Sequence, residues 1–127
     1  MSAALLVFLG GGLGSLARFG LGTLVGRTPS GGFPWATFAV NVIGSFALGA
    51  LVGYAAVRAT TDWPRTFLGI GVLGGFTTYS TFNQESLALV EARGPLAAGG
   101  YVLATVTVCL AAGWCGGVLV RRALGPT

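Results

Sequence analysis

The chain has 127 residues, of which 54% are hydrophobic and only 8% are charged, and its formal net charge is +4. Soluble domains average about 25% charged residues, so this composition excludes a disordered chain, a nucleic-acid-binding module and an ordinary soluble enzyme. It predicts an all-α integral membrane protein. A membrane-spanning helix needs about 20 apolar residues, which gives residues 1–127 room for a single unit of four transmembrane helices with short loops.

The apolar runs place the four predicted spans at residues 3–25, 35–57, 66–90 and 96–120. With this topology one membrane face carries four arginines, namely Arg58, Arg65, Arg121 and Arg122, and the other carries Arg27 and Arg93. Arginine bias sets the orientation of membrane proteins, and here the bias is weak. We therefore expect the chain to insert in both orientations and to form an antiparallel, dual-topology dimer.

Glycine is abundant, with 23 residues. Pairs of glycines four residues apart allow close approach of helices in lipid, and close packing is the interpretation we favour for most of them. The pairs are Gly10/Gly14, Gly22/Gly26, Gly49/Gly53, Gly71/Gly75 and Gly113/Gly117.

The centre of the third predicted span is unusually polar. Thr77, Thr78, Ser80 and Thr81 follow a glycine pair at 74–75. Glycine weakens a helix and hydroxyl groups compete for backbone hydrogen bonds, so we expect a break within residues 74–81. The alternative is an intact helix whose hydroxyls bond to its own carbonyls. In an antiparallel dimer two such breaks would bring free carbonyl oxygens together, which suits an alkali cation.

Two other spans carry stripes of neutral donors at a spacing of four residues. One stripe is Thr37, Asn41 and Ser45, and the other is Tyr101, Thr105 and Cys109. The stripes face no obvious acidic partner, and a membrane interior lined with neutral donors suits an anion. Aromatic ring edges are also positive, which adds Tyr79 and Phe82 as candidates. The alternative is that the stripes only hold helices together.

Three segments resemble the signatures of the Fluc (CrcB) fluoride channel family. They are the run from Gly10 to Arg18, the run from Trp35 to Phe46 through Asn41, and Gly74-Gly-Phe-Thr-Thr-Tyr-Ser-Thr-Phe82, which is the most specific. The resemblance implies an antiparallel dimer in the cell membrane that exports fluoride passively. It also implies a structural Na⁺ on the two-fold axis, held by backbone carbonyls of Gly74 and Thr77.

Site residues are assigned by matching positions in the motifs. The implied fluoride pathway comprises Asn41, Tyr79, Ser80, Thr81, Phe82, Tyr101, Thr105 and Cys109. Arg18 and Glu85 match residues with vestibular or structural roles.

Two positions depart from the family pattern. Family members usually carry Phe where Tyr79 stands and a hydroxyl where Cys109 stands. These changes leave open a homodimer or one half of a heterodimer. Two other functions stay open: a proton-coupled small multidrug transporter, for which Glu85 is the only acid inside a span, and a structural subunit that conducts nothing.

Overall fold

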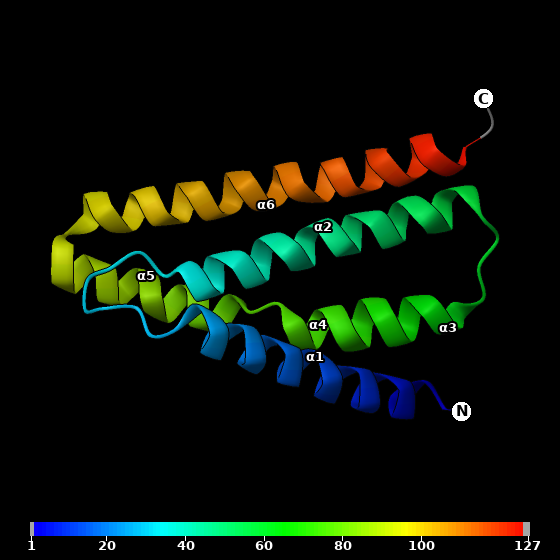
Figure 1. Cartoon of the computed structure of the whole chain (residues 1–127), viewed down its shortest axis with the longest axis horizontal. Coiled ribbons are helices and arrows are strands. Elements are labelled where there is room, and N and C mark those ends of the chain that lie inside the picture. Colours follow the sequence, from blue (N-terminus) through cyan, green and yellow to red (C-terminus); the bar gives the residue numbers. More distant parts are fainter. Residues whose placement is uncertain (1, 126–127) are drawn as a thin grey trace.

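The computed structural model describes residues 2–125, and nearly all of them lie in helices that run back and forth along one long axis (Figure 1). The elements are α1 (Ala3–Val25), α2 (Trp35–Val57), α3 (Asp62–Pro64), the π-helix η1 (Arg65–Leu73), α4 (Gly74–Phe76), α5 (Tyr79–Arg93) and α6 (Pro95–Leu124).

Three of these helices are long and apolar enough to cross a membrane, namely α1, α2 and α6, with 23, 23 and 30 residues. Their outward faces carry large apolar side chains such as Phe8, Leu24 and Leu103, which are at least 70% exposed. Such surfaces need a lipid environment. The protein is therefore a multi-pass membrane protein, and α1 and α2 begin and end where the sequence predicts. The last helix is longer than expected, because it continues from residue 120 to Leu124.

The third helical path is interrupted. It runs through α3, η1 and α4, loses helical geometry at Thr77 and Thr78, and resumes in α5. Both residues have extended backbone angles, with ψ values of 156° and 118°. The predicted break is confirmed and is shorter than expected, since residues 74–76 and 79–81 are helical. Thr77 Oγ1 also donates to the carbonyl of Leu73 at 3.0 Å, so local hydroxyl bonding accompanies the break without preventing it.

Glycines bring the helix backbones into contact in two places. In the α2–α6 pair, a Cβ added to Gly53 would lie 2.6 Å from the carbonyl oxygen of Gly117, and one added to Gly49 would overlap Gly113. On the other side, α1 packs against η1 and α4, where a Cβ on Gly10 would lie 2.6 Å from the carbonyl oxygen of Phe67. Four of the five predicted glycine pairs therefore pack as expected.

The fifth pair, Gly22/Gly26, does not pack, because added Cβ atoms at both positions would meet nothing within 4 Å. Gly26 instead takes a φ of +83° where α1 ends. This left-handed conformation favours glycine, so its role is to end the helix.

The two ends of the molecule differ in charge. The N-terminus, the connection between α2 and α3 and the C-terminus lie at one end, and the α1–α2 and α5–α6 connections lie at the other (Figure 1). The arginines therefore divide as the sequence predicts. Four lie at the end that holds the termini, and Arg27 and Arg93 lie at the opposite end.

Candidate functional site

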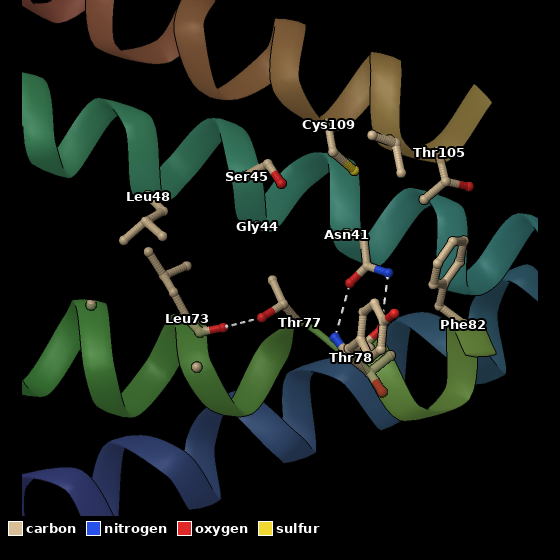
Figure 2. Close-up of a pocket in the computed structure, with 14 residues that line it drawn as sticks. Asn41, Gly44, Ser45, Leu48, Leu73, Thr77, Thr78, Phe82, Thr105 and Cys109 are labelled. Carbon is tan, nitrogen blue, oxygen red and sulfur yellow. Dashed lines mark hydrogen bonds between the residues drawn. The ribbon is translucent and has the colours of Figure 1, made fainter. Parts of the chain in front are cut away.

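The break in the third path is held by the side chain of Asn41 on α2. Asn41 Nδ2 donates to the carbonyl of Thr78 at 3.0 Å, and the Thr78 N–H donates to Asn41 Oδ1 at 2.9 Å (Figure 2). The amide thus bonds to both backbone groups of one residue, as a neighbouring β-strand would. One Nδ2 hydrogen of Asn41 remains for another acceptor, because a primary amide has two.

This arrangement leaves the carbonyls of residues 74–77 without the helical donors that they would have in an unbroken helix, and Gly74 and Thr77 are two of these four. In an unbroken helix Gly74 would accept from the Thr78 N–H, which instead donates to Asn41. Thr77 would accept from the Thr81 N–H, which instead donates to Thr78 Oγ1 at 3.3 Å. The Thr77 carbonyl meets Arg18 Nη1 at 3.5 Å. Gly74 and Thr77 are the two residues whose carbonyls the resemblance assigns to a cation.

A cavity of about 370 Å³ lies between α2, α6 and the third path, beside the break. Figure 2 shows Asn41, Thr77, Thr78, Phe82, Thr105 and Cys109 around this space. The predicted site residues that line it are Asn41, Gly74, Thr77, Tyr79, Phe82, Thr105 and Cys109. The structure therefore brings together residues from three separate predicted motifs.

Among the residues that the structure describes, Thr105 Oγ1 is the one buried side-chain polar atom without a hydrogen-bond partner. Its side chain is only 4% exposed, and it lines the cavity. A hydroxyl buried without a partner costs about 1–3 kcal/mol. Thr105 therefore lines the cavity as a residue, while its hydroxyl oxygen itself is buried.

Tyr79 and Phe82 lie on the first turn of α5 with their ring centroids 5.8 Å apart. Phe82 is buried, whereas Tyr79 is 79% exposed. Ser80 and Thr81, which lie between them, are exposed and do not line the cavity. Thr81 Oγ1 accepts from Thr78 Oγ1 at 3.0 Å, so Thr81 supports the turn after the break.

The polar stripes of α2 and α6 do meet an acid, which corrects the expectation that they face none. Thr37 Oγ1 donates to Glu85 Oε1 at 2.8 Å, and the Tyr101 hydroxyl donates to Glu85 Oε2 at 2.9 Å. The Tyr101 ring packs against Phe82 and Phe33, with centroids 5.3 and 5.2 Å away. The carboxylate is thus fixed between α2, α5 and α6, and Thr37 joins the candidate residues.

The sequence could have indicated Thr37 as a site residue, because Thr37 begins the donor stripe on α2. No sequence pattern indicates that Phe33 packs at the site, since it lies in a loop rich in glycine and proline. In the described part of the chain no group of three or more His, Cys, Asp or Glu residues could hold a metal ion.

A model of the family "CrcB-like protein, Camphor Resistance (CrcB)" matches residues 5–117, which covers the break, both donor stripes and Glu85. The chain belongs to the CrcB family. It is 48% identical to a protein of Anaeromyxobacter dehalogenans over 126 residues, covering 98% of this chain and all of that one. It is 46% identical to a protein of Sorangium cellulosum over 118 residues, covering 90% and 91% of the two chains.

A third relative, from Thermus thermophilus, is 50% identical over 91 residues, covering 72% of this chain and 73% of its own. All three relatives are named fluoride-specific ion channel FluC. The similarity to the CrcB relatives extends over nearly the whole chain in the first two cases. It therefore includes every element that contributes to the cavity.

Proposed function

We propose that this CrcB protein is a fluoride-selective ion channel that exports cytoplasmic F⁻ down its electrochemical gradient and so lowers intracellular fluoride. The observation that carries the proposal is the cavity beside the broken path, where the buried Thr105 hydroxyl has no partner. Membership of the CrcB family and the names of the relatives support it. The activity is transport rather than enzyme catalysis, since no covalent bond changes.

The chemistry of the donors accounts for anion passage. Taking an ion out of water into a medium of low dielectric constant costs on the order of 20 kcal/mol by an idealised estimate. Asn41, which has a free Nδ2 hydrogen, Thr105 and Cys109 border one cavity, and we propose that their donor groups together replace lost water. A narrow path with fixed donors solvates a small anion better than chloride, which is larger.

We propose further that each chain crosses the membrane four times and that two antiparallel copies form the channel. The third path supplies the fourth crossing, because irregular backbone at membrane depth is tolerated where protein or a cavity covers it. Exposed polar side chains on α5, namely Ser80, Asn83 and Gln84, also need cover by protein or water. The small difference in arginine count between the two ends is compatible with insertion in both orientations.

A structural Na⁺ between the two copies is part of the proposal. The carbonyls of Gly74 and Thr77 lack helical partners, and hard cations prefer oxygen ligands. Two oxygens from one protomer leave a coordination shell incomplete, so the other copy would supply the rest. When bound, the ion would hold the two breaks together.

Efflux from liposomes tests the function. Purified protein is reconstituted alone into vesicles loaded with KF or KCl, and anion release is measured with ion-selective electrodes after valinomycin is added. We expect rapid loss of F⁻ and retention of Cl⁻. Equal release of both anions, or release of neither even after a homologous subunit is added, contradicts the proposal. If F⁻ is released only after a homologous subunit is added, the channel is a heterodimer.

A further inference from the structure

The donors that would serve a permeating anion already hold an anion that belongs to the protein. Glu85 is one of three acidic residues in the chain. Its two carboxylate oxygens accept from the hydroxyls of Thr37 and Tyr101, at 2.8 and 2.9 Å. Thr37 is 5% exposed and Tyr101 is 1% exposed. Water therefore has little access to these hydroxyls, and each has its hydrogen committed to the carboxylate.

We propose that Glu85 is a tethered anion occupying a fluoride site that the hydroxyls of Thr37 and Tyr101 form. This inference rests on the fluoride-channel function and adds Thr37 to the ligands. Fluoride takes the pair of hydroxyls when the carboxylate swings away, and the carboxylate returns when fluoride leaves. One negative charge replaces another at the site, so the exchange requires no proton transfer.

The position of Glu85 between two cavities supports this exchange. The 370 Å³ cavity ends near Phe82 and Thr105, and Thr105 lies one helical turn from Tyr101 along α6. A second cavity of about 440 Å³ is lined by Glu85 and by the loop from Gly26 to Gly32. Phe82 lines the first cavity and Glu85 lines the second, less than one turn apart on α5. Thr37 and Tyr101 bond to Glu85, which lines the second cavity, and we infer that this pair is the polar step between the two cavities.

The second cavity also gives the displaced carboxylate a place to go. Arg27 lines it together with Glu85, so the side chain can rotate toward a cation as fluoride arrives. Attraction to the positive charge of Arg27 offsets the loss of the two charge-assisted hydrogen bonds that Glu85 accepts from Thr37 and Tyr101. In the described structure the carboxylate bonds to both hydroxyls.

The competing explanation is that Glu85 only positions Thr37 and Tyr101. The two roles predict different effects of removing the carboxylate. A tethered anion competes with fluoride, so Glu85→Ala lowers the fluoride concentration for half-maximal efflux. If the Thr37 and Tyr101 hydroxyls are free of the carboxylate about a tenth of the time in the wild type, the half-maximal fluoride concentration falls about tenfold in Glu85→Ala. A positioning role predicts loss of efflux with an equal or higher half-maximal concentration.

A small free carboxylate separates the two roles further. Sodium formate, present at equal concentration and pH on both sides of the vesicle, should enter the vacated site in Glu85→Ala and inhibit F⁻ efflux. It should not affect the wild type. A positioning role predicts that formate restores efflux or does nothing. Glu91→Ala is the matched control, because Glu91 is an exposed acid on the same helix.

The full experiment compares four proteins: wild type, Glu85→Ala, Glu85→Gln, and the double variant Glu85→Ala with Thr37→Val. Fluoride efflux is measured in liposomes. Fluoride binding to the detergent-solubilised proteins is measured by ¹⁹F NMR. We expect both single variants to bind fluoride more tightly than the wild type. We expect the double variant to lose this increase in affinity. Unchanged or weaker binding in Glu85→Gln, with efflux intact in the wild type, overturns the inference. Absence of F⁻ efflux in the wild type overturns the channel function itself.

Discussion

The α2–α6 pair and the third helical path achieve close packing in opposite ways. In the α2–α6 pair the helices keep their own hydrogen bonds, and glycines such as Gly49 and Gly53 let the backbones touch. The third path gives up helical bonds at Thr77 and Thr78 and depends on Asn41, Arg18 and its own hydroxyls for replacements. The cavity lies where these two kinds of packing meet. The α2–α6 pair supplies the donor side chains of Asn41, Thr105 and Cys109, and the third path supplies the freed carbonyls.

The largest expected effect on stability comes from a substitution that forces α2 and α6 apart. Gly49→Val would drive a side chain into the Gly113 backbone, and overpacking of this kind costs about 3 kcal/mol. We expect a clear fall in the free energy of unfolding, measured by thermal denaturation in detergent. Gly100→Ala is the control, because a Cβ there meets nothing within 4 Å. Equal stability of the two variants would refute the backbone contact.

The next effect comes from the bond that holds the break. Asn41→Asp keeps the acceptor for the Thr78 N–H and places a carboxylate oxygen against the Thr78 carbonyl. We expect a loss of about 2 kcal/mol in stability, because buried groups are left unpaired, and a severe fall in F⁻ efflux. Asn83→Asp, at an exposed amide on α5, should leave both quantities nearly unchanged. Normal efflux in Asn41→Asp would remove Asn41 from the pathway.

Thr105 should affect stability and efflux in opposite directions. Thr105→Val removes a buried hydroxyl that has no partner, so the free energy of unfolding should rise by about 1 kcal/mol. Fluoride efflux should fall about fivefold, since a fluoride hydrogen bond of similar size is lost. Thr107→Val, at an exposed position on α6, serves as the control. If Thr105→Val lowers stability, its hydroxyl has a structural partner.

The smallest effect is expected at Tyr79, which is 79% exposed. Tyr79→Phe keeps the ring and removes a hydroxyl, so stability should change by less than about 0.5 kcal/mol. F⁻ efflux should be retained or improved. Complete loss of efflux would mean that the hydroxyl itself binds the ion.

Helix positions and the break could be predicted because they depend on local sequence. The apolar runs fix α1 and α2, and the glycine pair at 74–75 with the hydroxyls after it marks the interruption. Gly74 and Thr77 are among the freed carbonyls because the break separates residues 74–77 from their helical donors at 78–81. All these features lie within a few residues of each other along the chain.

The partnership of Glu85 with Thr37 and Tyr101 could not be predicted in this way. A helical wheel drawn through the third span assumes one continuous rotation, and the extended backbone at Thr77 and Thr78 resets that rotation. The face of α5 that meets α2 and α6 is therefore undetermined by spacing alone. Thr37 lies 48 residues from Glu85, so the contact depends on the arrangement of three helices.

The π-helical segment η1 has a consequence for insertions and deletions. Its hydrogen bonds span five residues, as in Gly74 N–H to Gly69, so it holds more residues per turn than an α-helix. Deleting one residue between Arg65 and Leu73 would tighten this coil toward ordinary α geometry, and the face presented by Gly74 and the residues after it would be preserved. The same deletion in α2 would rotate every later side chain by about 100° and separate Asn41 from either Thr37 or Ser45. Length variation among natural sequences should therefore be tolerated in η1 and rare in α2.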